Sequence, residues 1–443
     1  MSPAIAMHMK RYLMALLLPL PVLALATEES SDEDWNLHGQ ATYVWQRKSP
    51  FQAAYSGPNS LGTQAEKSYS FSGTLFFGLR LAPGSELYFN PEVVQSVPMS
   101  GLTGLGGMIN SEQQKSSGPN PTFYRARLFL RQTWNLDGEA TRLDSGQNQL
   151  ASTVSTRRVV VTAGNYAITD IFDNNAYAHD GRTQFLNWSL LTYGAFDYAA
   201  DTRGYTWGAA LEYYDQDWVY RYGRYLVPEQ SNGQQLDTRI LRHYGDQAEI
   251  EHDHQIGGQP GKLRLLVFHN RVVSGSFRDA LAAAAANGGP PSVAAVRKPQ
   301  DKYGLGFSAE QNLAADIGIF LRASWNDGKT ETYAFTEVER SLTVGASISG
   351  QRWERADDVL GVALIRNGLS AAHRDYLAAG GMGVFIGDGR INYRPEQILE
   401  AYYNLRLAKD STVALDLQKI FNPAYNADRG PVLVLGARLH TEF

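Results

Sequence analysis

Residues 68–94 read SYSFSGTLFFGLRLAPGSELYFNPEVV, two runs of alternating residues on either side of a short break. From Tyr69 to Leu81, aromatic and aliphatic residues alternate with small and polar ones, and the alternation resumes from Leu87 to Val93. A period of two residues is typical of a β-strand with one apolar and one polar face. Only Ala82-Pro83-Gly84 separates the two runs, which indicates two antiparallel strands joined by a tight turn.

The same alternation recurs along the rest of the chain. It predicts about sixteen strands of roughly ten residues, the length that a tilted strand needs to cross a bilayer. The predicted strands are 37–46, 68–81, 85–94, 123–134, 157–164, 204–214, 217–225, 245–256, 262–271, 302–310, 315–325, 341–350, 357–366, 397–407, 411–420 and 432–443. The final strand ends on the aromatic Phe443, which resembles the signal that outer-membrane insertion machinery reads.

The connections between these strands alternate between long and short. The long connection 48–67 is followed by the tight turn at Pro83-Gly84, and the bare hairpin at Asp215-Gln216 follows the long connection 165–203. Only 135–156 breaks the rule, because it has a middling length where a tight turn is due. Short periplasmic turns and long extracellular loops are typical of outer-membrane barrels. The sequence therefore predicts an all-β, transmembrane antiparallel β-barrel.

Composition excludes several other classes of protein. The chain has 443 residues, no cysteine, and 40 Lys and Arg against 45 Asp and Glu. The lack of cysteine excludes a disulfide framework, a zinc ribbon and a thiol nucleophile. The slightly acidic balance argues against nucleic acid as a partner, because phosphate binding needs a surplus of basic residues. After the N-terminus, the sequence has no apolar run long enough for a membrane-spanning helix.

The N-terminal segment predicts the compartment. Lys10 and Arg11 precede a short apolar run that ends at Ala24-Leu25-Ala26, the pattern of a secretory signal peptide cleaved near Ala26. We therefore predict a signal peptide over residues 1–26, a flexible lead-in over 27–36 and a barrel domain over 37–443. A signal peptide together with a barrel indicates the outer membrane of a Gram-negative cell, where lipid and lipopolysaccharide surround the protein.

The parity of each strand predicts which side chains face the lumen. In 85–94 and 123–134 the large apolar set faces lipid, because a lipid-facing Arg near the midplane costs about 2–4 kcal/mol. The intervening charged and polar set then lines one sector of the pore. The predicted pore-lining residues on these and the preceding strand are Arg80, Glu86, Asn90, Glu92, Arg125, Arg127 and Arg131. The alternative for each of them is that it only lines a water-filled lumen and pairs with its neighbours, without contacting a substrate.

Many stretches of the chain resemble the OprB-type carbohydrate-selective porin family, and they run in the same order. They cover nearly the whole chain from about residue 37. The stretches are Tyr55–Ser60 (YSGPNS), Asn90–Glu92 (NPE), Arg127–Thr133 (RLFLRQT), Tyr177–Leu190 (YAHDGRTQFLNWSL), Phe196–Gly204 (FDYAADTRG), Phe385–Gly389 (FIGDG), Asn392–Glu400 (NYRPEQILE) and Phe421–Val432 (FNPAYNADRGPV).

The resemblance implies a sixteen-stranded porin for passive, sugar-preferring diffusion, with loops folded into the lumen. By the same resemblance, the connections 95–122 and 165–203 would narrow the pore, and Asn187 and Trp188 would offer an amide and a stacking face to sugar. Burial of Trp188 beneath its own loop is the alternative reading. We expect mono- and small oligosaccharides as substrates, with no cofactor, and a monomer or homotrimer.

Three rival functions start from particular residues or charges. His179-Asp180 could serve as an acid-base pair in a hydrolase, but the chain has no G-x-S-x-G or H-E-x-x-H motif, so no catalytic residue is predicted. The acidic and amide residues between Asp170 and Asp180 could hold Ca²⁺, yet their spacing misses the EF-hand order and no metal is predicted. A general diffusion porin and an exopolysaccharide-export barrel remain as alternatives. An export barrel would be expected to carry a partner-docking domain or lumenal charge of one sign.

Overall fold

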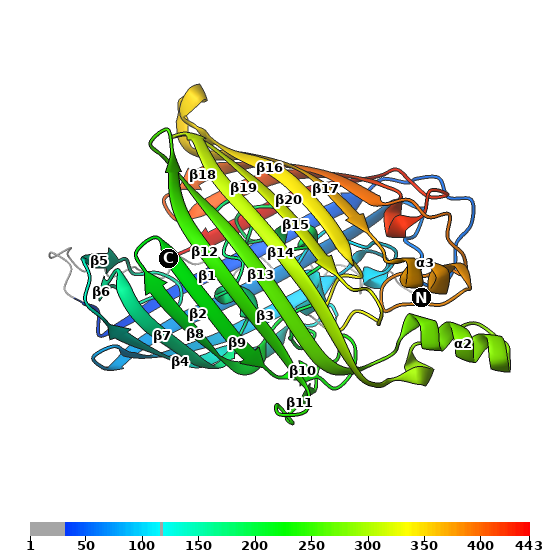
Figure 1. Cartoon of the computed structure of the whole chain (residues 1–443). Helices are drawn as coiled ribbons and strands as arrows, with labels where there is room; N and C mark the ends of the chain where they lie inside the picture. Colours follow the sequence, from blue (N-terminus) through cyan, green and yellow to red (C-terminus); the bar gives the residue numbers. More distant parts are fainter. Residues whose placement is uncertain (1–31, 116–117) are drawn as a thin grey trace, which may run out of the picture.

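Each alternating segment of the sequence forms a strand, and the strands close into an antiparallel barrel in the computed structural model (Figure 1). The model describes residues 32–115 and 118–443. Over these residues the barrel has sixteen strands, so the predicted fold is confirmed. They are β1 (Trp35–Lys48), β2 (Glu66–Ala82), β3 (Ser85–Val97), β4 (Thr122–Asn135), β7 (Arg157–Tyr166), β8 (Thr206–Asp215), β9 (Trp218–Tyr225), β12 (Tyr244–Ile256), β13 (Gln259–Ser274), β14 (Lys298–Ala314), β15 (Ile317–Asn326), β16 (Arg340–Gly350), β17 (Arg355–Gly368), β18 (Glu396–Ala408), β19 (Ser411–Phe421) and β20 (Val432–Glu442).

Strands that follow one another in the barrel are hydrogen-bonded, and the barrel closes where β1 pairs with β20. The pairing at this seam runs from Gln40 opposite Glu442 to Lys48 opposite Val434. At its end Phe443 exchanges backbone hydrogen bonds with Gly39, at 3.1 and 3.0 Å. The strand β1 begins two residues before the predicted start at Leu37. The predicted signal peptide and residues 27–31 of the predicted lead-in lie outside the described residues.

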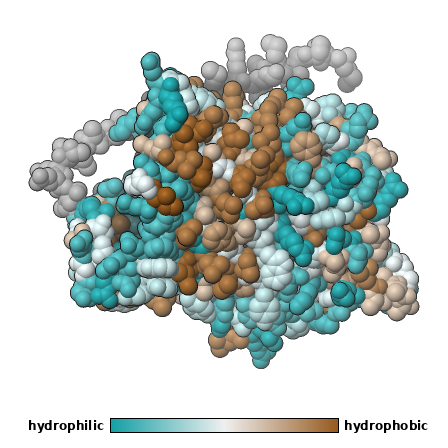
Figure 2. All heavy atoms as spheres, turned by 45° about the horizontal axis from the view of Figure 1, so that its top comes forward, coloured by the Kyte–Doolittle hydropathy of each residue, from teal (hydrophilic) through white to brown (hydrophobic). Residues whose placement is uncertain are grey.

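The outer face of the barrel is apolar and the inner face is polar. On β2, Ser70 and Ser72 face inward and are buried, whereas Leu75 on the opposite parity is 45% exposed. Figure 2 shows the result as a broad hydrophobic region on the outer surface, with hydrophilic residues on either side. This arrangement is what a bilayer requires, because its core can hydrogen-bond neither side chains nor backbone. None of the helices within residues 32–115 and 118–443 is long and apolar enough to cross a membrane.

The two ends of the barrel differ, as predicted. At one end, which we call the turn end, neighbouring strands are joined by tight turns such as Gly257-Gly258, whose φ angles of 59° and 76° suit glycine. The other end, which we call the loop end, carries the long connections. These contain the helices α1 (Trp188–Leu191), α2 (Phe277–Asn287) and α3 (Ala371–Ala378), the short strands β10 (Val227–Pro228) and β11 (Leu236–Asp237), and the 3₁₀ turns η1 (Met99–Leu102), η2 (Gln113–Lys115), η3 (Ile168–Asp170), η4 (Ala294–Val296) and η6 (Pro423–Tyr425).

Two connections at the turn end are longer than a tight turn. One contains the 3₁₀ turn η5 (Gln351–Trp353). The other, 136–156, joins β4 to β7 and is the connection that broke the predicted rule. It forms a two-stranded hairpin of β5 (Ala140–Leu143) and β6 (Ser152–Ser155), which lies at the opposite end of the barrel from α2 and α3 (Figure 1).

Above the lumen, a buried histidine ties loops together at the loop end. The Nδ1 atom of His373 on α3 lies 2.8 Å from a carboxylate oxygen of Glu339, and its Nε2 atom lies 3.5 Å from Glu337. Both carboxylates belong to the connection between β15 and β16. Phe277 at the start of α2 stacks on the imidazole at 4.2 Å. This cluster therefore joins three connections at the loop end.

Candidate functional site

Two connections from the loop end fold into the lumen, as the resemblance predicted. Residues 98–121 follow β3 and residues 167–205 follow β7. Their backbone is hydrogen-bonded to inward-facing side chains of β1, β12–β15 and β18–β20, and we call the inner face of β1 and β12–β20 the anchor wall. Loop residues on this side are almost fully buried, as Asp173, Asn187 and Asp197 illustrate.

The anchor wall holds the 167–205 loop through charged groups. Arg438 on β20 donates to the carbonyl oxygens of Gly181 and Thr183, at 3.0 and 2.8 Å. Glu400 on β18 accepts the N–H groups of Leu186 and Asn187, at 2.5 and 3.1 Å. A loop crossing a barrel would leave its backbone groups unpaired, so these contacts satisfy the groups that the fold exposes.

Ion pairs between side chains complete the attachment. Arg322 on β15 pairs with Asp173 at 3.0 Å, and Lys302 on β14 pairs with Asp197 at 2.8 Å. All four side chains are at most 2% exposed. Because each buried charge has a partner, the loop is fixed against the wall instead of hanging freely in the lumen.

The 98–121 loop is attached in the same way. Glu396 on β18 accepts the N–H groups of Gly106 and Gly107, at 2.9 and 2.8 Å. The carbonyl oxygen of Ile109 accepts from both Gln46 and Gln418, each at 2.9 Å. A Cβ at Gly106 would lie 2.4 Å from the hydroxyl of Tyr425, so only glycine fits this close approach.

The two loops leave an open path along the other side of the lumen. Two cavities of about 490 and 730 Å³ lie there, and we call them the outer and inner cavity because they lie toward the loop end and the turn end. Among the described residues, the barrel-strand residues that line them all belong to β2, β3, β4, β7, β8 and β9, and the β5–β6 hairpin adds further lining to the inner cavity. We call the inner face of these strands the passage wall. Four residues line both cavities and mark their junction: Arg131, Gln149, Asp170 and Asn174.

Charged side chains of both signs surround the outer cavity. Arg127 on β4 forms two hydrogen bonds with the carboxylate of Asp170, at 2.7 and 2.6 Å. From the loops, Arg182 lies 3.2 Å from Glu112, and Lys115 lies 2.9 Å from the same residue. These pairs present donors and acceptors side by side, which is what a hydroxyl group needs as a partner.

Electrostatics keep these loop groups charged. Burial would raise the pKa of Glu112, but Arg182 and Lys115 outweigh it and hold the pKa below its ordinary value. The carboxylates of Glu112 and Glu92 in turn raise the pKa of Arg182 against its own burial. His179, which also lines the outer cavity, is different, because burial and then Arg322 lower the pKa of its imidazole. It is therefore neutral at neutral pH.

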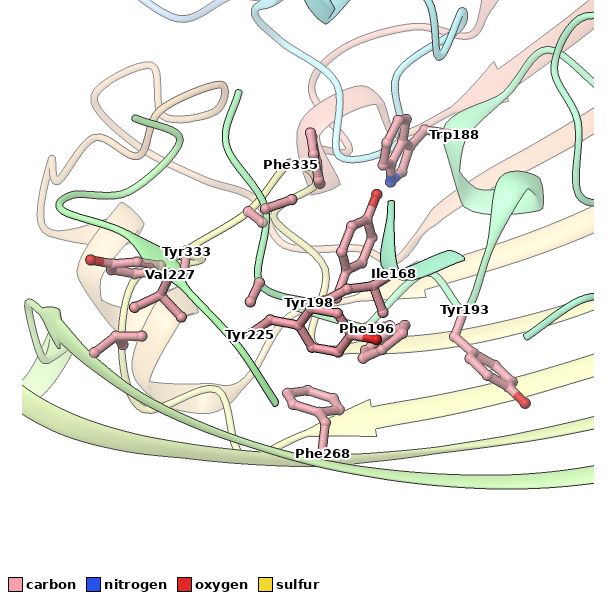
Figure 3. Packing of buried hydrophobic residues seen from close by; sticks show 14 of the residues in the cluster. Ile168, Trp188, Tyr193, Phe196, Tyr198, Tyr225, Val227, Phe268, Tyr333 and Phe335 are labelled. Carbon is pink, nitrogen blue, oxygen red and sulfur yellow. The ribbon is translucent and has the colours of Figure 1, made fainter. Parts of the chain in front are cut away.

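Aromatic rings form another part of the outer cavity. The rings of Trp188 and Phe335 lie 4.5 Å apart, and Tyr198 lies beside Phe335 at 5.2 Å. Figure 3 shows Trp188 and Phe335 next to each other, and Phe196 and Phe268 beside each other closer to the barrel strands. Trp188, Phe335 and Tyr198 all line the cavity. The predicted Trp188 thus lies beneath its loop and also at the edge of the open path.

Several predicted pore-lining residues lie on the passage wall. Arg127 lines the outer cavity, Arg80 and Glu86 line the inner one, and Arg131 lines both. Arg80 and Glu86 pair with each other at 3.3 Å. The parity predicted for β3 agrees with the structure in this region, since its inward residues are buried and Phe89 is exposed.

Three other predicted residues face inward without lining the outer or the inner cavity. Glu92 is 2% exposed and binds Arg182 at 2.8 Å, so it supports a cavity residue from behind. Asn90 donates to Asn148 at 2.9 Å and is fully buried. Asn187 is also fully buried, and its side chain caps α1 by accepting from Ser189 at 3.0 Å.

The predicted inward orientation of Arg125 is wrong. Asn90 lies opposite Arg127, but the next residue, Pro91, lies opposite Arg125, so β4 has a bulge at Ala126. A bulge adds one residue and reverses the parity beyond it. Tyr124 and Ala126 consequently turn inward, and Arg125 lies on the outer face, 5.1 Å from the ring centre of Trp207.

The sequence analysis missed Glu112, Lys115, Arg182 and Gln149. All four lie in connections, where no periodic pattern shows which way a side chain points. One available signal was overlooked at Asn187, because an Asn immediately before a short helical run such as WSLL is a typical N-cap.

Comparisons with known proteins agree with this architecture. The family model described as "Carbohydrate-selective porin, OprB family" matches residues 59–443. The high-pH structure of Pseudomonas putida OprB is similar, with a TM-score of 0.69 and 16% identity over 93% of this chain and 94% of that one. Its low-pH structure has a TM-score of 0.50 and 13% identity, covering 93% of each chain. No curated protein matches the chain in sequence.

Proposed function

This chain belongs to the OprB family of carbohydrate-selective porins, and we propose that small sugars cross it by passive diffusion through the outer and inner cavities. The protein is a sugar porin of the Gram-negative outer membrane, a channel and not an enzyme. In such barrels the short turns face the periplasm. The turn end is therefore periplasmic and the loop end extracellular.

The observation that carries the proposal is the mixed lining of the outer cavity. A sugar has hydroxyl groups that both donate and accept hydrogen bonds, and C–H faces that pack on aromatic rings. The cavity offers Arg127 and Lys115 as donors, Asp170 and Glu112 as acceptors, and the ring of Trp188 at its edge. Such a lining lets a sugar exchange its water for protein contacts.

Selective diffusion also requires that the contacts stay weak. A site that holds its substrate tightly stops conducting. Here the charged groups already pair with one another, as Arg127 does with Asp170 at 2.6 Å. A passing hydroxyl group must compete with these pairs, which limits the net gain on binding. We propose that Arg80, Glu86, Arg127, Arg131 and Trp188 contact the sugar, while Asn90, Glu92 and Asn187 hold neighbouring groups in place.

The charges of the lining favour sugar uptake over the export alternative. An export barrel was expected to carry a partner-docking domain or lumenal charge of one sign, whereas both guanidinium and carboxylate groups line each of the two cavities. A general diffusion porin differs only in lacking a preference among solutes of similar size. The test must therefore measure that preference. The oligomeric state, monomer or homotrimer, stays a prediction.

The test uses the purified protein in liposomes. We expect glucose to enter faster than an amino acid of similar size, and Arg131→Ala to reduce that ratio by about threefold to tenfold, as the loss of one charged hydrogen-bond donor implies. Arg352→Ala is the matched control, because Arg352 is 58% exposed and pairs with Asp316 away from both cavities. Equal rates of entry for the two solutes in the unmodified protein would contradict the proposed sugar preference and indicate a general diffusion porin.

A further inference from the structure

The hairpin of residues 136–156 reaches from the periplasmic end into the open path. We propose that its tip, Gln147–Gln149, contacts the sugar where the outer and inner cavities meet, and so contributes to selectivity from the periplasmic side. This inference rests on the proposed function. It adds the hairpin tip as a second part of the pore that contributes to sugar selectivity. The first element is the pair of loops that enter from the extracellular end.

The tip is held inside the barrel by residues of the passage wall. The carbonyl oxygen of Asn148 accepts from Arg131 at 3.0 Å, and its side chain accepts from Asn90 at 2.9 Å. Asn148 has a φ of 58°, the left-handed conformation that Asn tolerates well. The next contact is made by Leu150, which is fully buried and whose N–H donates to the hydroxyl of Tyr88 at 3.1 Å.

The base of the hairpin is held by the segment that precedes β1. Glu33 donates its N–H to the carbonyl oxygen of Ala151 at 2.8 Å, and its carboxylate accepts the N–H of Ala151 at 2.7 Å. Asp32 accepts from the N–H of Thr153 at 2.8 Å. With both tip and base attached, the hairpin has a defined position, as a residue that selects a substrate requires.

At the junction of the cavities, the tip adds uncharged groups to charged ones. Gln147, Asn148 and Gln149 all line the outer cavity, and Gln149 lines the inner cavity as well. It shares the junction with Arg131, Asp170 and Asn174. A solute that moves from one cavity to the other must pass these four side chains.

Part of this junction is free to bind a solute. Within the described part of the chain, the side-chain oxygen of Gln149 has no hydrogen-bond partner, and its nitrogen donates only to the carbonyl of Leu150, at 2.7 Å. The amide of Asn174 likewise has no partner within residues 32–115 and 118–443, and Asn174 is exposed to the lumen. These amides can serve the hydroxyl groups of a neutral sugar without attracting ions of either sign.

The absence of cysteine from the chain permits a direct test. Gln149→Cys is reconstituted in a planar bilayer and treated with a small charged thiol reagent, while the current and the rate of modification are followed. We expect modification to reduce the current, and glucose to slow modification by about threefold or more, because a bound sugar covers the thiol. Gln351→Cys is the matched control, since Gln351 is an exposed glutamine in another periplasmic turn and lines neither cavity.

A second variant measures the contribution of the amide itself. Gln149→Ala should raise the glucose concentration that half-saturates uptake by about twofold to tenfold, the range expected for one lost hydrogen bond. Unchanged saturation in Gln149→Ala, together with modification of Gln149→Cys that glucose does not slow, would overturn the inference. If the unmodified protein takes up glucose and an amino acid of similar size at equal rates, the proposed function fails instead, so the two failures can be told apart.

Discussion

The anchor wall and the passage wall use the same kinds of residue for opposite purposes. On the anchor wall, Glu400 and Arg438 are buried and bind the backbone of a loop. On the passage wall, Arg127 and Arg131 line the cavities and bind side chains or a single carbonyl. An inward-facing charge is therefore not by itself a sign of a substrate contact. What distinguishes the two walls is whether a loop covers the charge.

This difference also separates stability from selectivity. A charge covered by a loop stabilises the fold because its removal leaves a buried partner unpaired. When a charged side chain beside a cavity is removed, water can solvate the partner that is left, so the loss of stability should be small. The substitution should instead change the rate or selectivity of transport. Substitutions of the same type on the two walls test this division.

The largest effect on stability is expected for Arg322→Met on the anchor wall. Arg322 is 2% exposed, and its loss leaves the buried carboxylate of Asp173 without its cation. We expect the free energy of unfolding to fall by about 3–5 kcal/mol, the range for breaking a buried ion pair. Urea unfolding followed by tryptophan fluorescence measures the change, and single-channel recording should show a larger, noisier current as the loop loosens.

The double variant Arg322→Met with Asp173→Asn serves as the control. It removes the uncompensated charge, so part of the lost stability should return. A single variant as stable as the unmodified protein would mean that the loop is not fixed by this wall.

A smaller change in the free energy of unfolding is expected when pH changes the protonation of His373 at the loop end. Burial disfavours the charged form of His373, but Glu339 and Glu337 outweigh it and raise the pKa to about 9. A pKa above the ordinary value of about 6.5 means that the stabilisation is complete below pH about 6.5 and is lost as pH rises through about 9. Between these limits we expect a loss of about 3 kcal/mol.

Urea unfolding at several pH values from 6 to 10 measures this loss. The comparison is the double variant His373→Asn with Glu339→Gln, which replaces the ion pair by neutral amides. In that variant the free energy of unfolding should not decline between pH about 6.5 and about 9, the pKa values of His373 in the unfolded and folded protein. The same decline in both proteins would exclude His373 as its source.

The smallest effect on stability and the largest on selectivity are expected for Arg127→Met on the passage wall. The side chains of Arg127 and Asp170 are 13% and 29% exposed, and they face the outer cavity. Their pairing should contribute at most about 1 kcal/mol to stability. Liposome swelling should nevertheless show a weaker preference for glucose, and conductance should rise because the opening is wider. A loss of stability as large as that of Arg322→Met would remove the distinction between the walls.

The barrel could be predicted from the sequence because apolar residues of the outer face alternate with polar residues of the inner face along each strand. The predicted strand 85–94 lies within β3, and its inward residues Glu86, Asn90 and Glu92 are buried as expected. The exception at Arg125 has a physical cause. Phe123 and Tyr124 are both aromatic, so the sequence does not show at which residue the bulge reverses the parity of β4.

The cavities could be predicted only in part, because most of their lining comes from connections. Arg127 and Arg131 lie on a strand, and their alternation with Leu128 and Leu130 shows that they point inward. Arg182, by contrast, is positioned by Glu92 and Glu112, which are far from it in sequence. Contacts of this kind arise from the folded loops, so no local pattern reveals them.

The seam between β1 and β20 makes the two edges of the sheet depend on each other during assembly. Until β20 pairs with β1, both strands carry a row of unsatisfied N–H and C=O groups, which hydrocarbon does not tolerate. The ring of Phe443 fits where Gly39 has no side chain, since a Cβ there would lie 2.6 Å from it. A partly built cylinder alone in the bilayer would therefore be unstable at both edges, and formation of the seam between β1 and β20 satisfies both at once.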